Sequence, residues 1–290
     1  MLVGGYVVYL IRTDSKLPWE SSSTSSADPT RPSGPGSFMQ FNISCVPESE
    51  QACASTDNVG QSAFTIESSA STEKAFGDNS PKAPDAWLTT ALGYERIRLV
   101  RPDLKVAGNV ASTRIVVVTK VGAKNTAASC AGKLACVANA GRVSFPAPET
   151  GASLWIATAA VDTLVGAGQE SAALDDIDGA SDVVQGIRRS KKPTPVEALS
   201  NLVSVQLLDA AVLPEAAVRS IAPSGATVTP SDTTPISYVL VVAESVSSAQ
   251  AKQLVNAISA SLAANGFNPP TNNLPLPNPG LANDINQRLG

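Results

Sequence analysis

The pattern of apolar and polar positions first shows two segments that are apolar along almost their whole length. Residues 114–119 carry Ile, Val, Val and Val in succession, and residues 236–243 read ISYVLVVA. Such runs are typical of strands buried on both faces, which occur in parallel or mixed sheets between layers of helices. Shorter strands are expected at residues 39–44, 63–67 and 142–145, and a turn into a short buried run at 84–88.

Helices are expected where apolar residues recur every three or four positions. Residues 154–165 carry such a stripe, with Thr150 as the N-cap. Thr194, Pro195 and Glu197 form a capping box with proline in the first turn, which predicts a second helix start. Two further helices are expected at residues 248–265 and 281–289, and the Ser-rich loop 68–72 is expected to cap a short helix after it. Strands that alternate with helices predict an α/β fold.

The N-terminal region has a different character. Residues 2–11 are apolar but too few to span a bilayer, which takes roughly 20 apolar residues. Residues 20–37 are rich in Ser, Pro and Gly and predict a flexible linker. We interpret residues 1–19 as the remnant of a membrane anchor and 38–290 as the folded domain; the alternative is that the apolar run is a core strand.

Composition narrows the function classes. The 290 residues carry a net charge of -4 and contain no histidine, and the isoelectric point is near 5.0. This net negative charge offers no basic surface for the phosphate backbone of a nucleic acid. Without histidine, the usual triads and zinc hydrolysis sites are excluded, and no nucleophile is paired with a base. We therefore expect neither an enzyme nor a bound cofactor or metal.

The cysteines fall in two close pairs, Cys45 with Cys53 and Cys130 with Cys136. Two local disulfides are the simplest interpretation, because neither spacing matches a zinc knuckle. Oxidised pairs would place the domain outside the cytosol, on the extracellular face of the membrane or in the cell envelope.

Five segments, in order, resemble the type II periplasmic-binding-protein family, especially the actinobacterial extracellular solute-binding proteins distantly related to molybdate-binding proteins. These segments are residues 84–88 (PDAWL), 108–113 (GNVAST, followed by the valine run), 145–151 (FPAPETG), 233–238 (TTPISY) and 265–270 (NGFNPP). The resemblance implies two α/β lobes with crossovers near 108–114 and 230–238. It also implies a ligand cleft between the lobes.

Helix N-termini facing such a cleft would suit an oxyanion or a carboxylate. The resemblance gives these candidate ligand-binding residues: Ser68, Ser69, Asp85, Trp87, Ser112, Thr113, Thr150, Gly151 and Tyr238. Five of them have a structural alternative: Ser68, Ser69 and Thr150 as helix caps, and Trp87 and Tyr238 as core residues. The strongest candidates are Ser112 and Thr113. The basic residues Arg188, Arg189, Lys191 and Lys192 are interpreted as a solvated loop.

One segment departs from the family pattern. The family begins with a strand followed by a helix that contributes to the ligand site, but the stretch between Phe41 and Phe64 shows no amphipathic helix. Two functions therefore stay open. One is a membrane-tethered extracellular module that binds a small ligand between the lobes and presents it to a membrane partner. The other is an adaptor of the cell envelope whose cleft is degenerate and binds nothing.

Overall fold

A computed structural model describes residues 41–56, 62–120, 129–140, 142–165, 180–189, 199, 202, 208–219, 225–271 and 274–289. Contacts divide the chain into two units, Met1–Ser37 and Phe38–Gly290, and all described residues belong to the second. The expected anchor, the expected linker and most of the helix expected after Thr194 lie outside the described residues. In the part of the chain that is described, no helix combines the length and apolar character that a membrane span requires.

The first lobe is built on a five-stranded mixed sheet in the order β2-β1-β3-β9-β4. Strand β1 pairs in parallel with β2 and β3, whereas β9 pairs antiparallel with β3 and β4. The strands are β1 (Asn42–Cys45), β2 (Ala63–Ile66), β3 (Ala86–Thr90), β4 (Lys105–Thr113) and β9 (Ile236–Val242). The apolar run in β9 is buried at every position because it lies inside the sheet with helices on both faces.

The second lobe has a four-stranded sheet in the order β6-β7-β5-β8. Its strands are β5 (Ile115–Thr119), β6 (Val143–Ser144), β7 (Ala210–Pro214) and β8 (Thr227–Pro230). Strand β5 pairs antiparallel with both β7 and β8, while β6 and β7 are parallel. The expected fold class, α/β with mixed sheets flanked by helices, is confirmed.

The chain passes between the sheets twice. It leaves the first sheet at the end of β4, continues through Arg114 and enters the second sheet with β5. It returns between β8 and β9, so that residues far apart in sequence meet at the boundary. The guanidinium of Arg114 bonds both carboxylate oxygens of Glu215 at 2.8 and 3.0 Å beside the first crossing.

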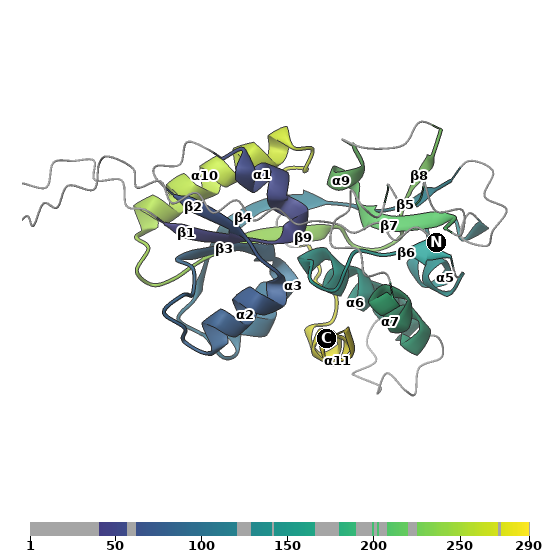
Figure 1. The fold of residues 1–290 in the computed structure, drawn as a ribbon, viewed down its shortest axis with the longest axis horizontal. Helices are drawn as coiled ribbons and strands as arrows, with labels where there is room; N and C mark the ends of the chain where they lie inside the picture. Colours follow the sequence, from purple (N-terminus) through teal and green to yellow (C-terminus); the bar gives the residue numbers. More distant parts are fainter. Residues whose placement is uncertain are drawn as a thin grey trace, which may run out of the picture. The chain divides into compact units, whose positions relative to one another are not determined.

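Helices cover both faces of the first sheet (Figure 1). On one face lie the short helix α1 (Glu50–Ala54) and the long helix α10 (Ser248–Ala264). Helices α2 (Ser69–Gly77) and α3 (Ala91–Arg98) lie on the other. Helix α10 starts at a capping box made by Ser247 and Gln250, which fixes its first turn.

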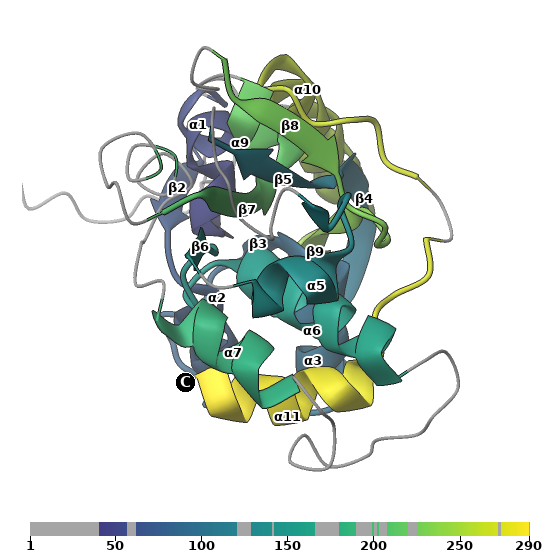
Figure 2. The same ribbon diagram turned by 90° about the vertical axis from the view of Figure 1, so that its right-hand side faces the viewer.

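The second lobe carries α5 (Leu134–Asn139), α6 (Gly151–Val165) and α7 (Ala180–Arg189) on one side of its sheet and α9 (Glu215–Arg219) on the other, as Figure 2 shows. The one-sided stripe expected for α6 is wrong. The helix is buried on every side from Gly151 to Val161 because α5, α7, β3 and the C-terminal helix α11 (Pro279–Leu289) surround it.

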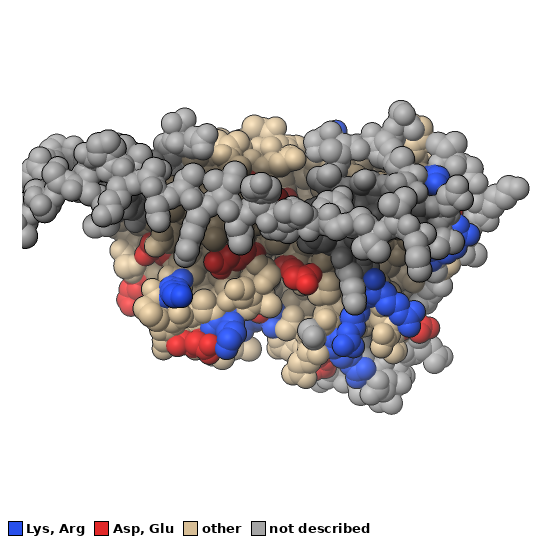
Figure 3. All heavy atoms as spheres, viewed as in Figure 1, with Lys and Arg blue, Asp and Glu red and all other residues tan. Residues whose placement is uncertain are grey.

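Two other local expectations are corrected. Helix α2 begins at Ser69, so the Ser-rich stretch is its first turn rather than a preceding loop. Arg188 and Arg189 form the exposed last turn of α7 rather than a loop. Figure 3 shows basic side chains gathered in the region of α7, while both signs of charge mix near α2 and α3. Lys191 and Lys192 lie outside the described residues.

The largest apolar core spans the two lobes, and each lobe also has a smaller cluster of its own. A single cluster of buried side chains runs from Ile43, Leu88 and Leu240 in the first sheet to Val117 and Val212 in the second. The terminal helix α11 contacts α6 and α7 of the second lobe and also α3 of the first. The described lobes therefore pack against each other directly.

Candidate anion site between the two lobes

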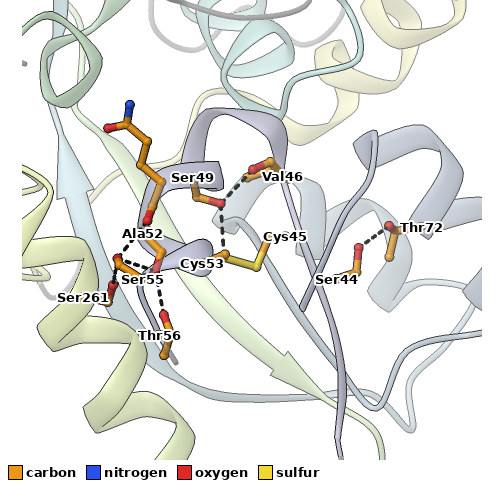
Figure 4. The surroundings of a disulfide bond; sticks show 11 residues. Ser44, Cys45, Val46, Ser49, Ala52, Cys53, Ser55, Thr56, Thr72 and Ser261 are labelled. Carbon is orange, nitrogen blue, oxygen red and sulfur yellow. Dashed lines mark hydrogen bonds between the residues drawn. A yellow bond between two sulfur atoms is a disulfide. The ribbon is translucent and has the colours of Figure 1, made fainter. Parts of the chain in front are cut away.

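The segment after β1 stands where the family pattern has a full helix. It forms only the 3-10 helix η1 (Pro47–Ser49) and the five-residue helix α1. The Cys45–Cys53 disulfide closes this segment onto the end of β1. Figure 4 shows how hydroxyl groups fix it further, with Ser49 donating to Val46 O at 2.7 Å and Ser261 of α10 donating to Ala52 O at 2.6 Å.

Glu48 lies in η1 and points its carboxylate at the start of α6. Its Oε1 accepts the N–H of Ala152 at 2.7 Å and the hydroxyl of Tyr238 at 3.4 Å. Helix α6 begins at Gly151, so Ala152 offers one of the N–H groups that the helix cannot satisfy itself. The positive end of the helix dipole adds to the attraction for a carboxylate. The N-terminal end of α6 in the second lobe thus holds the carboxyl group of a residue in the first lobe.

A second helix begins at the same place. Ser68 caps α2 by accepting the N–H of Ser71, and the N–H of Ser69 donates to Glu149 O at 3.1 Å, just before α6. Thr150 caps α6 by accepting the N–H of Ser153 at 3.1 Å. The starts of α2 and α6, from different lobes, therefore lie against each other beside Glu48.

Space at this junction is tight, and glycine is the residue that fits. A Cβ on Gly151 would lie 3.1 Å from Glu48 Oε1, 3.2 Å from Thr90 Cγ2 and 3.4 Å from Ser69 Oγ. Contacts of 3.1 and 3.2 Å are closer than a Cβ normally makes. The absence of a side chain at Gly151 is what lets Glu48 approach the helix start.

Burial dominates the electrostatics of the site. It raises the pKa of Glu48 from 4.5 to about 7, although the N–H groups of Glu48, Ala152 and Gly151 and the Tyr238 hydroxyl lower it. Burial and the neighbouring charge of Glu48 raise the pKa of Tyr238 well above 10. Near neutral pH the site thus exchanges one proton, on Glu48.

Several polar atoms at the junction have no hydrogen-bond partner among the described residues. They include Glu48 Oε2 and Ser69 Oγ, both shielded from solvent. Buried polar atoms are normally paired, and each exception calls for an explanation. One hydroxyl donor and one carboxylate oxygen are thus available to a further polar group.

Of the nine candidate residues, three converge on Glu48: Ser69, Gly151 and Tyr238. Thr150 and Ser68 lie beside them and cap helices, the role expected for them if they do not bind a ligand. Tyr238 is fully buried in β9, as the core alternative requires, but its hydroxyl also reaches the site.

The other four candidates make structural contacts elsewhere. Asp85 accepts the backbone N–H of Asn42 at 2.9 Å, and Trp87 is fully buried against Phe76. Ser112 donates to Pro269 O at 2.9 Å, and Thr113 accepts the N–H of Ala216 at 3.0 Å, capping α9. Ser112 and Thr113, the strongest sequence candidates, thus stabilise the crossover.

Sequence reasoning missed Glu48. The available signal was an acidic residue three positions after the end of β1, in the segment where the expected helix is absent. Its inward direction could not be inferred, because η1 has no periodic pattern from which a facing side can be read.

Both expected disulfides form, Cys45–Cys53 and Cys130–Cys136, and no free cysteine occurs among the described residues. The described part of the chain contains no cluster of three or more Cys, Asp or Glu side chains that could hold a metal ion.

Comparison with solved structures defines the class of fold. The sulfate-binding protein SubI from Mycobacterium tuberculosis matches with a TM-score of 0.56 at 14% identity, over 79% of this chain and 86% of that one. Iron-bound HitA from Pseudomonas aeruginosa matches at 0.53 and 13% identity, over 84% and 94%. Trichodesmium IdiA (FutA), in complex with iron and citrate, matches at 0.51 and 10% identity, over 87% and 97%.

At these identities the likeness concerns the fold. The chain has the two-lobed fold of type II periplasmic-binding proteins, and proteins that bind anions or metals share it. No protein-family model matches the sequence, and neither does any curated protein sequence.

Proposed function

We propose that this chain is an extracytoplasmic, membrane-tethered module that binds a small anion between its two lobes. The observation that carries the proposal is the 2.7 Å bond from the Ala152 N–H to a carboxylate oxygen. The start of α6 already holds a carboxyl group, with the Tyr238 hydroxyl on the same oxygen. Helix N-termini bind carboxylates and oxyanions in this way.

The unpaired hydroxyl of Ser69 supports the same proposal. It is a donor, and an oxyanion or carboxylate brings acceptors, so binding would satisfy a group that is now unpaired. The position outside the cytosol is supported by the two disulfides. Intact mass measured without reductant should be four hydrogens below the fully reduced value, two for each disulfide; free thiols would count against this position.

Thermal unfolding with a panel of sulfate, molybdate, phosphate and small carboxylates tests the binding. A ligand at 100 times its dissociation constant stabilises the folded state by about 2.7 kcal/mol. Sodium chloride at equal ionic strength is the control. In Tyr238→Phe, which loses the hydroxyl that reaches the site, the stabilisation should shrink. An identical effect of sodium chloride, or an unchanged response in Tyr238→Phe, would argue against the site.

The presence of Glu48 at the start of α6 also favours a second function. Glu48 belongs to the protein itself, and the largest core spans both lobes, which also fits an envelope adaptor whose cleft is permanently filled. The adaptor predicts no stabilisation by any member of the panel.

A further inference from the structure

The group that occupies the anion position is part of the chain. We propose that Glu48 is an internal competitor: its carboxylate holds the start of α6 when no ligand is present, and a ligand carboxylate or oxyanion binds by displacing it. This inference rests on the proposed function and adds that the ligand must compete with the Glu48 carboxylate for the start of α6.

Direct competition follows from the geometry. Glu48 Oε1 takes the Ala152 N–H at 2.7 Å and the Tyr238 hydroxyl at 3.4 Å, so a second anion could reach these donors only if Glu48 left. The close approach at Gly151 leaves little room for both. Two negative charges side by side in a buried place would also repel each other strongly.

Glu48 leaves polar atoms at the site without hydrogen bonds, and this allows a ligand to displace it. Its Oε2 has no hydrogen-bond partner among the described residues, and neither has the hydroxyl of Ser69 at the start of α2. A ligand free to orient its oxygens toward the Ser69 hydroxyl would gain a bond that Glu48, fixed to η1, does not make. Small carboxylates are the closest chemical match, because a carboxylate already occupies the position.

The short segment that carries Glu48 allows its side chain to leave the site. The residue lies in a 3-10 helix of three residues and is only half-buried, although its carboxylate tip is shielded. The Cys45–Cys53 disulfide holds the ends of this segment. The side chain can therefore rotate out without the segment losing its place on the sheet.

The test measures binding of sodium propionate and of sodium sulfate by calorimetry to the full chain at one ionic strength. Four proteins are compared: wild type, Glu48→Ala, Glu48→Gln and Glu50→Ala. Glu48→Ala should bind propionate at least about tenfold more tightly than wild type, which equals ~1.4 kcal/mol. Glu48→Gln should show no such gain, because its amide oxygen can still accept the Ala152 N–H. Glu50→Ala, which removes an exposed acid two residues away, should match wild type.

The outcomes separate the inference from the proposed function. Equal affinities in wild type and Glu48→Ala would overturn the competitor and leave ligand binding standing. Binding by Glu48→Ala alone would support the competitor and count against ligand binding by the natural protein. No binding by either would overturn both. If Glu48→Ala does not fold, Glu48→Ser replaces it, because its hydroxyl is too short to reach Ala152, and the same outcomes apply.

Discussion

At the scale of single residues, Glu48 is held by opposing effects. Burial disfavours its charge, while the helix N–H groups and the Tyr238 hydroxyl favour it, and the net result is a pKa of about 7 instead of 4.5. A carboxylate with these surroundings is common at functional sites, where a proton is exchanged near neutral pH. The surroundings also make the residue measurable, because the folded and unfolded states bind its proton differently.

This difference predicts how stability depends on pH. The folded state holds the proton of Glu48 more tightly than the unfolded chain, so its stabilising contribution is complete below pH 4.5 and is lost as the pH rises through about 7. The loss is on the order of 3 kcal/mol, since one pH unit of difference corresponds to about 1.4 kcal/mol. Urea unfolding of wild type and Glu48→Gln between pH 4.5 and 8 measures it.

A second buried carboxylate, Glu73, makes the comparison of wild type with Glu48→Gln necessary. Burial also raises its pKa to about 7 despite its 2.6 Å ion pair with Arg96, so wild type loses stability for two reasons over the same range. The difference between wild type and Glu48→Gln isolates Glu48. Parallel curves for the two proteins would mean that Glu48 is not buried at the start of α6.

Gly151 gives an independent test of the packing. Gly151→Ala should lower the free energy of unfolding by about 1 to 3 kcal/mol, because its Cβ would press on Glu48 Oε1 and Thr90 Cγ2. Gly77→Ala is the matched control, since it also lies in a helix but its Cβ would meet nothing within 4 Å. Equal effects of the two substitutions in thermal or urea unfolding would show that the junction has room for a side chain at residue 151.

At the scale of elements, the strong local patterns predicted well. The apolar runs became β5 and β9, and the periodic segments became α6, α10 and α11 with boundaries within a few residues. In each case burial of a continuous apolar surface decides the structure, and burial is what the pattern encodes. The Thr150 cap was predictable for the same local reason.

Elements with mixed patterns were not predicted. Strand β4 is exposed or half-buried over its first half and carries no clear apolar run. The apolar run of β7 is buried throughout, but it is short and ends at Pro214. Pairing with β9 and β5 stabilises them, and such pairing depends on the fold as a whole. Glu48 was missed for a related reason: its partners Ala152 and Tyr238 are about 100 and 190 residues away in sequence.

The Cys45–Cys53 disulfide should be important for the element that carries Glu48. Replacing both cysteines with alanine should cost about 2 to 5 kcal/mol, because both are buried and the bond closes the segment that replaces the family helix. Equilibrium unfolding measures this cost. The same change at Cys130 and Cys136, at the partly exposed α5, should leave the pKa of Glu48 unchanged; a change of that pKa in the second variant alone would contradict the assignment.

At the scale of the molecule, the described lobes behave as one packed body. The shared core and helix α11, which contacts α6, α7 and α3, join them. The Arg96 side chain of α3 also donates to Asn283 of α11 at 3.2 Å.

Continuous packing predicts cooperative unfolding. Calorimetry at pH 5 should show a single transition with equal calorimetric and van't Hoff enthalpies, because the largest core cluster contains residues of both lobes. Truncation of α11 should lower the midpoint of both lobes together, since it buries Leu281, Ile285 and Leu289 against them. Two separate transitions would mean that the lobes are independent.

The most direct measurement of the central claim is a pH titration of the Ala152 amide by NMR. Its N–H donates to Glu48 Oε1 at 2.7 Å, so its chemical shift should titrate with a midpoint near 7, the pKa of Glu48, and the titration should vanish in Glu48→Gln. An Ala152 amide that stays constant from pH 5.5 to 8.5, or that titrates equally in Glu48→Gln, would contradict the account.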